Sequence, residues 1–241
     1  MWKDRGDWDY RKINDRDALT DAYVELTKNL RVMNGRGLSG AVYTQTTDVE
    51  IEVNGHLTYD RAQFKLDPER VRQANAELQQ PQLLITTLLP TSESIPQRWQ
   101  FTHKQPPAEW TRGDFDARSW QQGPGVFGTV KTHPLIVRTE WDGDAIWLRR
   151  PFMLPKNTTG EVCLLTHHVG AADFFINGQP LQIGHAATAG YRLLRLDPAV
   201  LAKLQAGRNQ LAVHVRPGTG EAYFDAGVVA VRHSDAPAKG N

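Results

Sequence analysis

The second half of the chain holds a series of short runs rich in β-branched and aromatic residues, and this series restricts the possible folds more than any other feature. Turn signals such as Asn177-Gly178 separate the runs. The runs occupy residues 145–152, 161–168, 172–176, 191–196, 210–216 and 226–232. Short strands at regular intervals are typical of an antiparallel β-sandwich or barrel. Residues 198–204 predict a single helical turn between two of these strands.

Residues 1–80 follow a different order, which reads helix, strand, helix. Apolar residues at three- and four-residue spacing predict a helix over 17–33, with Asn14 at its polar start. Residues 38–45 are small and apolar and are flanked by glycines, which predicts a short strand buried on both faces. Asp67 as N-cap and Pro68 at the first helical position predict a second helix.

The two halves are joined by a stretch rich in Pro, Gln, Thr and Ser that includes the apolar patch 83–89. We therefore expect a mainly β protein in which an antiparallel sandwich follows a short α/β segment. The expected boundaries are 1–80 for the α/β segment, 81–96 for a linker that contains or leads into a first strand, and 97–235 for the sandwich.

Charge and hydropathy exclude several classes of partner. The chain has 28 lysines and arginines against 27 acidic residues, a net charge of +1, so it lacks the basic surface that nucleic acids require. No stretch approaches the roughly 20 apolar residues of a membrane span, and the charged start of the chain is unlike a signal peptide. We expect a soluble protein, cytoplasmic as written, or periplasmic or secreted if a longer protein carries an export signal.

Residues 37–61, GLSGAVYTQTTDVEIEVNGHLTYDR, resemble the last strand and following loop of the (β/α)8 barrel in glycoside hydrolase family 2, the β-galactosidase and β-glucuronidase group. The resemblance implies that the preceding helix packs outside a barrel and that residues 64–78 leave along its closing helix. It also implies that both catalytic glutamates, on the fourth and seventh barrel strands, lie outside this chain. A barrel needs about 250 residues, so residues 1–80 do not form one alone.

The second half resembles the galactose-binding-like jelly roll that is appended to many such hydrolases. The resemblance rests on the segment Asp114-Phe115-Asp116, on Trp120 and on residues 146–155, 172–181 and 207–218. Where related domains carry an acidic run, this chain has residues 167–170, His-His-Val-Gly, so no calcium or ligand site is carried over. The resemblance thus implies a C-terminal fragment of a hydrolase of O-glycosyl bonds, itself without catalytic carboxylates.

Asp48 and Glu50 are the carboxylates nearest to the barrel-like motif. Residues two apart on a strand lie about 6.6 Å apart on one face, whereas a retaining glycosidase holds its pair about 5 to 5.5 Å apart across the substrate. We therefore predict no catalytic pair. Gln45, Asp48 and Glu50 would follow the last barrel strand, where barrel enzymes place substrate-contacting groups, and they are candidates to bind sugar hydroxyls. The alternative is that they satisfy backbone groups of the loop around Asn54.

Tryptophans in polar, glycine-rich surroundings offer a second route to carbohydrate binding. Trp120 and Trp141 are the candidates to stack on sugar rings, with Trp110, Trp147 and Tyr223 in similar settings. Two alternatives to the hydrolase fragment therefore stay open: a non-catalytic carbohydrate-binding module, or a structural domain whose tryptophans pin loops. Exposed, coplanar tryptophans would favour the module, and buried ones the structural domain.

We predict no metal and no cofactor. Adjacent residues of a strand point to opposite faces, so His167 and His168 do not chelate one ion together, with or without His185. The single cysteine, Cys163, lies in an apolar run and is expected to be a buried strand residue. The expected partners are carbohydrate and, through the incomplete barrel segment, a second copy of the chain, because an unpaired strand exposes its edge.

Overall fold

The structure is a computed structural model that describes residues 13–129, 137–141, 143–182, 188, 190–218 and 222–234. These residues form two compact units. The first comprises the described residues up to Leu84 together with His233 and Ser234, and the second runs from Ile85 to Arg232. No helix in the described ranges has the length and apolar character that crossing a membrane requires.

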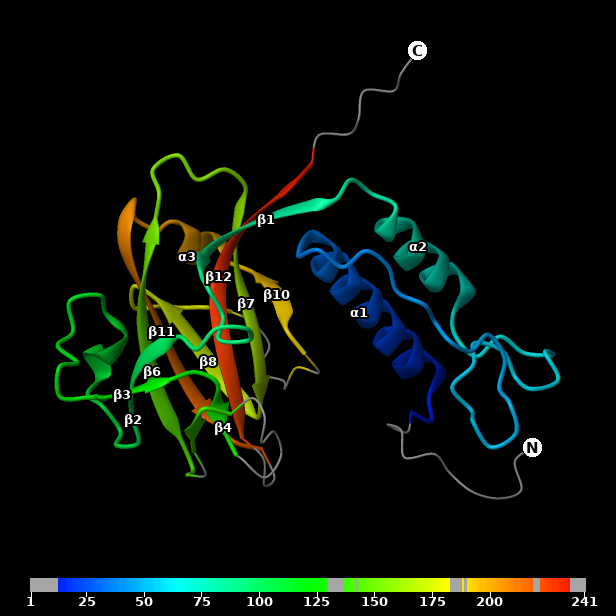
Figure 1. Cartoon of the computed structure of the whole chain (residues 1–241), viewed down its shortest axis with the longest axis horizontal. Helices are drawn as coiled ribbons and strands as arrows, with labels where there is room; N and C mark the ends of the chain where they lie inside the picture. The colour runs from blue at the N-terminus through cyan, green and yellow to red at the C-terminus, as the bar shows by residue number, and fades with distance from the viewer. Residues whose placement is uncertain are drawn as a thin grey trace, which may run out of the picture. The chain divides into compact units, whose positions relative to one another are not determined.

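Two helices dominate the first unit (Figure 1). Helix α1, Arg16–Gly35, covers the predicted range 17–33, and its N-cap is Asp15 and not Asn14: the Asp15 carboxylate accepts from the backbone N–H of Ala18 at 2.7 Å. Helix α2, Pro68–Leu78, has the expected cap: Asp67 accepts from the backbone N–H groups of Glu69 and Arg70. The helices pack together, and the Tyr23 hydroxyl of α1 donates to Asn75 of α2 at 2.9 Å.

The strand expected at residues 38–45 does not form, and this prediction is wrong. The segment is irregular and mostly exposed, with Val42 at 85% and Tyr43 at 47% of their full exposure. A strand buried on both faces needs neighbours on either side, and none is present in the described part of the first unit. Isolated bridges between Thr47 and Leu57, and between Leu57 and Phe64, order the loop that follows.

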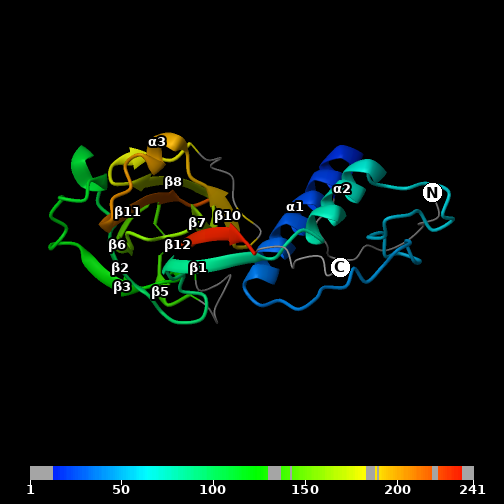
Figure 2. The same ribbon diagram turned by 90° about the horizontal axis from the view of Figure 1, so that it is seen from above.

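The second unit is a β-sandwich, and each sheet has six strands in the described residues (Figures 1 and 2). One sheet has the order β10-β7-β12-β4-β5, with β1 also paired to β12. Its strands are β1 Leu83–Leu89, β4 Phe127–Gly128, β5 Thr139–Glu140, β7 Glu161–Val169, β10 Arg192–Arg195 and β12 Tyr223–His233. The pairs that β7 makes with β10 and β12 are antiparallel, whereas β4 and β5 are parallel.

The other sheet has the order β3-β2-β6-β11-β8-β9 and is antiparallel. Its strands are β2 Arg98–Thr102, β3 Gln121–Pro124, β6 Ile146–Leu154, β8 Ala171–Ile176, β9 Gln179–Pro180 and β11 Gly207–Arg216. The 3₁₀ helix η1, Ala108–Thr111, lies in the β2–β3 connection, and α3, Pro198–Leu201, is shorter than the expected turn. The antiparallel sandwich predicted from the sequence is therefore confirmed.

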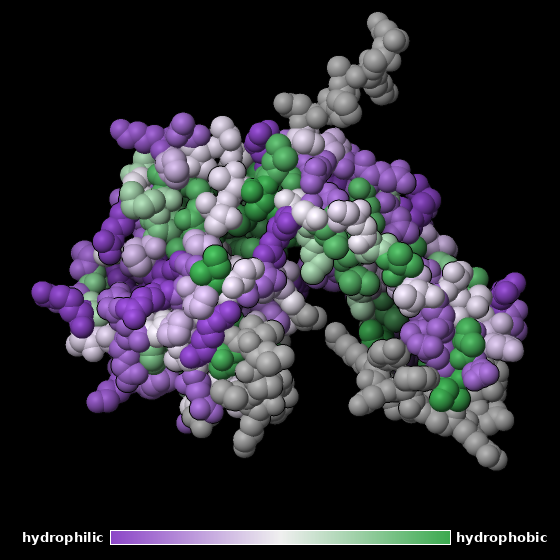
Figure 3. Space-filling model, viewed as in Figure 1, coloured by the Kyte–Doolittle hydropathy of each residue, from purple (hydrophilic) through white to green (hydrophobic). Residues whose placement is uncertain are grey.

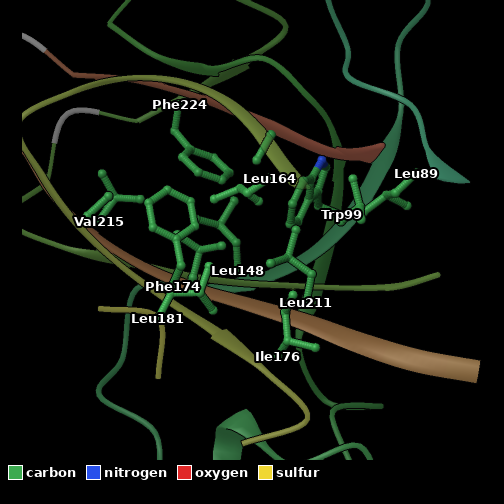
Figure 4. Packing of buried hydrophobic residues seen from close by; sticks show 14 of the residues in the cluster. Leu89, Trp99, Leu148, Leu164, Phe174, Ile176, Leu181, Leu211, Val215 and Phe224 are labelled. Carbon is green, nitrogen blue, oxygen red and sulfur yellow. The ribbon is translucent and has the colours of Figure 1, made fainter. Parts of the chain in front are cut away.

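The core lies between the two sheets and follows the alternation of the strands. Figure 4 shows Trp99, Phe174 and Phe224 from three different strands meeting there, surrounded by leucines and valines. The Trp99 and Phe224 rings make an edge contact at 5.4 Å between centroids. Burying a side chain of this size contributes roughly 1.5 to 3 kcal/mol.

The expected linker is part of the sandwich over much of its length. Residues 83–89 form β1, and several hydrogen bonds tie the segment from Pro90 to Gln97 to the rest of the sandwich. Arg150 donates to the carbonyl of Pro90 at 2.7 Å and to the Gln97 side chain at 2.6 Å. Arg138 donates to the carbonyl of Ser92 at 2.8 Å, and the Ser92 N–H donates to Asp225 at 2.6 Å. This segment, called the β1–β2 strap below, therefore has a fixed path.

Candidate functional site

Asp48, one of the predicted sugar-contacting residues, is a loop anchor in the first unit. Its Oδ1 atom accepts from the Gly55 N–H at 2.9 Å and from Lys65 Nζ at 2.6 Å, and 1% of the residue is exposed. Lys65 also donates to the carbonyl of Val53 at 2.7 Å. A Cβ atom at position 55 would lie 2.3 Å from the Thr47 carbonyl carbon, so the turn requires glycine.

Gln45 and Glu50 are not brought together with Asp48 as a polar cluster. The Gln45 side chain donates to the carbonyl of Glu52 at 3.0 Å, which satisfies loop backbone. Glu50 is exposed and has a φ of 50°, in a tight turn where Val49 and Glu52 exchange backbone hydrogen bonds. The strand spacing assumed for Asp48 and Glu50 does not apply, because no strand forms here.

Trp120 belongs to an aromatic cluster in the β2–β3 connection of the second unit. Its ring stacks on Trp110, with 6.2 Å between centroids and 26° between planes, and Phe115 contacts it edge-on. Trp110 is 8% exposed and contacts Phe175 of β8, so the cluster fastens this connection to the outer face of the second sheet. Trp120 itself is partly exposed.

Arg149 of β6 lies under the same connection and is 2% exposed. Its guanidinium sits 5.1 Å from the centroid of Phe115 and donates to the carbonyl of Arg112 at 2.9 Å. Burial, reinforced by the nearby positive charge of Arg208, lowers the pKa of Arg149 to about 10. No sequence pattern indicates this buried cation, because arginines are mostly exposed in folded proteins.

Trp141, the other predicted stacking residue, is 1% exposed and packs in the core, so its ring offers no face to a sugar. Its indole N–H is buried and has no hydrogen-bond partner within the described residues. The residue nevertheless borders a cavity of about 350 Å³ at one end of the sandwich. The lining also includes His103, Glu140, Gly143, Asp144 and Trp147.

Trp147 has a fixed orientation at this cavity. Its partly exposed ring stacks on His214 of β11, with 4.7 Å between centroids and 5° between planes. His214 in turn lies 3.4 Å from the Asp173 carboxylate, which Arg216 contacts at 2.6 Å. Burial and the Arg216 charge lower the pKa of His214, so a neutral imidazole supports the indole.

Asp225 lies within β12, and no sequence pattern predicts its surroundings. Its carboxylate is fully buried and accepts from the Ser92 N–H at 2.6 Å and from the Tyr191 hydroxyl at 2.5 Å. Burial raises the pKa of Asp225 to about 6. The apolar sequence around it, from Tyr223 to Val231, was the available signal for a buried carboxylate.

His167, His168 and Cys163 occupy ordinary positions in a strand. His168 is 1% exposed and its ring contacts Phe174 of the core, whereas His167 packs against Tyr223 on the opposite face. Within the ranges that the structure describes, no three metal-ligating side chains gather, and His185 lies outside them. Cys163 is buried, which raises the pKa of its thiol to about 12.

The described residues thus form a helical segment with an anchored loop and a β-sandwich that has a polar cavity at one end. No protein-family model matches it, and no curated protein is found similar in sequence. The solved structures that it matches include parts of glycoside hydrolases. A β-glucuronidase from Bacteroides uniformis is 20% identical with a TM-score of 0.44 over 62% of this chain and 18% of that one.

Two further glycoside hydrolase structures match over similar shares of the two chains. A family 2 glycosyl hydrolase from Bacteroides cellulosilyticus is 14% identical with a TM-score of 0.42, over 60% of this chain and 20% of that one. A β-glucuronidase from Bifidobacterium dentium, complexed with coumarin-3-O-glucuronide, is 20% identical with a TM-score of 0.38, over 55% and 20%. The chain therefore spans about a fifth of the length of the hydrolases that it matches.

Proposed function

We propose that this chain is the C-terminal part of a family 2 glycoside hydrolase, that residues 1–80 are a segment of its barrel, and that the sandwich is a non-catalytic, carbohydrate-binding unit. The observation that carries the non-catalytic assignment is the position of Asp48. Its Oδ1 atom is occupied by Lys65 and Gly55, and Glu50 lies in an exposed turn. Neither residue is arranged as the acid and nucleophile that a retaining mechanism requires.

The carbohydrate assignment is supported by the resemblance of residues 37–61 to the family 2 barrel and by the polar cavity at the end of the sandwich. Sugar sites combine an aromatic ring with a small number of placed hydrogen-bonding groups. The cavity offers Trp147, an indole N–H and two carboxylates. The oligosaccharide or glycoside would be held near the catalytic part of the whole hydrolase, and hydrolysis would take place there.

The experiment is an assay of the purified chain against a panel of nitrophenyl β-glycosides, with an intact family 2 hydrolase as positive control. We expect no turnover by the chain on any substrate. Turnover that disappears in Asp48→Asn or Glu50→Gln would contradict the proposal and require a mechanism based on this loop. A parallel titration of the chain with simple sugars tests the binding role separately.

A purely structural sandwich is the second candidate. The burial of Trp99, Trp110 and Trp141 favours it, because these rings fill the core or fasten loops instead of meeting solvent. The two candidates differ in the titration: a structural domain binds none of the sugars, whereas a binding unit shows saturable binding to at least one of them.

The exposed segment 38–45 supports the assignment of residues 1–80 as an incomplete unit. Figure 3 shows hydrophobic surface patches among polar ones on the first unit, and exposed apolar side chains include Leu38, Val42 and Tyr43. In a whole barrel the neighbouring strands would cover such a segment. In this chain alone the same surface would promote self-association.

A further inference from the structure

The cavity at the end of the sandwich lies between two connections of the second unit. Trp141, Gly143 and Asp144 lie between β5 of one sheet and β6 of the other, and His103 directly follows β2. The side chains of His103, Glu140 and Asp144 are exposed, and all three border the cavity. Loops at the end of a rigid sandwich are well suited to hold a ligand, because the strands fix their positions.

The unpaired indole N–H of Trp141 is the feature that indicates a ligand-binding site. The residue is 1% exposed, borders the cavity and leaves its one polar hydrogen without a partner among the described residues. A buried donor without an acceptor costs about 1 to 3 kcal/mol, and such groups are uncommon. A ligand oxygen that reached this N–H would remove that cost.

Gly143 is a neighbour of this buried N–H at the cavity. A Cβ atom at position 143 would lie 3.6 Å from Trp141 Nε1 and 3.8 Å from Cδ1, which is ordinary contact distance. The backbone does not require glycine here, because the φ of Gly143 lies outside the left-handed region. A larger side chain at this position would occupy the space in front of the indole edge.

Glu140 and Asp144 supply acceptors beside this donor. No ion pair engages either carboxylate within the part of the chain that the structure describes, and His103 makes only a ring contact with Phe101. Carboxylates accept hydrogen bonds from hydroxyl groups and repel anions. One donor with two acceptors matches the hydroxyl groups of an uncharged sugar and disfavours a uronate, a phosphate or a sulfate.

Trp147 completes the arrangement with an apolar surface. Its stacking on His214 fixes the indole before any ligand arrives, which lowers the entropic cost of binding. A pyranose ring presents C–H groups on one face and hydroxyls at its edge, so it needs an aromatic surface and hydrogen-bonding groups together.

We propose that this cavity binds one uncharged hexose residue, with Trp141 Nε1 donating to a sugar oxygen, Glu140 and Asp144 accepting from hydroxyls, and Trp147 contacting the ring. The inference rests on the proposed carbohydrate-binding role and adds the site and the charge of its ligand. Trp141 therefore takes part through its N–H edge and not by stacking.

The test is a titration of the full chain with methyl β-glycosides of glucose, galactose and mannose, and with methyl β-glucuronide, followed by calorimetry and tryptophan fluorescence. Gly143→Leu fills the cavity, and Trp141→Phe removes the N–H while keeping an aromatic ring. Gly190→Leu is the matched control in the same unit, because no described atom lies within 4 Å of a Cβ there. Circular dichroism verifies that each variant is folded.

We expect saturable binding of at least one neutral glycoside, weakened at least tenfold by Gly143→Leu and about tenfold by Trp141→Phe, with no change in Gly190→Leu. The glucuronide should bind at least tenfold more weakly. Neutral-sugar binding that survives Gly143→Leu would overturn this site but leave the carbohydrate-binding role intact. Absence of binding by the unmodified chain would overturn that role as well, and equal binding of the glucuronide would contradict the charge argument.

Discussion

The backbone N–H of Ser92 donates to the carboxylate of Asp225 at 2.6 Å, which joins the β1–β2 strap to the last strand of the sandwich. Tyr191 donates to the same oxygen at 2.5 Å. The second carboxylate oxygen and the Ser92 hydroxyl are buried without a partner in the described residues. The buried negative charge of Asp225 therefore receives few hydrogen bonds, which agrees with the rise in its pKa.

This shift makes stability depend on pH. The pKa of Asp225 is raised from 3.8 to about 6 on folding, so the native state holds a proton that the unfolded chain has released between these values. The free energy of unfolding should therefore fall by about 3 kcal/mol as the pH rises from about 4 to about 6. Urea denaturation of the sandwich at several pH values measures this slope.

Asp225→Asn should remove that part of the slope, because an amide accepts from Ser92 and Tyr191 without titrating. The exposed Asp114→Asn serves as control and should leave the slope unchanged. An equal slope in Asp225→Asn and in the unmodified chain would show that another group is responsible.

Cys163 should be inert to thiol reagents in the folded protein. It is 1% exposed, and burial raises its pKa to about 12, so neither access nor the thiolate form is available at neutral pH. Ellman's reagent should label the unfolded chain fully in urea and the native chain negligibly over minutes. Rapid stoichiometric labelling without denaturant would contradict the buried strand position.

Asp48→Asn should loosen the loop between residues 46 and 65. The substitution keeps an acceptor oxygen but removes the negative charge opposite the mostly buried Lys65, and breaking a buried ion pair typically costs about 3 kcal/mol. Hydrogen exchange of the Gly55 amide should accelerate accordingly. Glu50→Gln, in an exposed turn, should change stability by about 0.5 kcal/mol or less, and a similar effect of both variants would argue against the anchor role.

Val42→Lys should reduce self-association. Val42 is 85% exposed in an apolar segment, so a charge there removes hydrophobic contact between copies. Sedimentation velocity over a range of concentrations should show association of the unmodified chain and less of it in the variant. Met153→Lys, at a residue 60% exposed on the sandwich, is the matched control. Reduction of association by both variants alike would indicate a general effect of charge.

Elements that are defined by local sequence signals, such as caps and turns, were predictable from the sequence. Asp67 and Pro68 define the start of α2, and the turn at Asn177 and Gly178 has positive φ at both residues, as Asn-Gly turns between strands do. The longer strands β6, β7, β11 and β12 have enough β-branched and aromatic residues to stand out.

Elements that depend on distant partners were not predictable in this way. β4 and β5 have two residues each, and β3 reads Gln-Gln-Gly-Pro, so only their neighbours in the folded sheet define them. Residues 38–45 have the pattern of a buried strand but lack partners. At the candidate site, the sequence alone identified Trp141 and Trp147 as aromatic residues in polar surroundings. The burial of Trp141 and the stacking of Trp147 on His214 were not predictable, because they depend on packing between strands far apart in sequence.

The fixed path of the β1–β2 strap has a consequence for limited proteolysis. A cut in residues 79–82, between α2 and β1, would leave every buried hydrogen bond of the strap in place and should yield a stable sandwich. A cut between Pro90 and Gln97 would free the groups that Arg150 and Asp225 hold, and each of these two buried charged side chains would then lose hydrogen bonds. Digestion should therefore stop at a fragment that begins before Leu83, well ahead of the boundary that composition alone would place at residue 97.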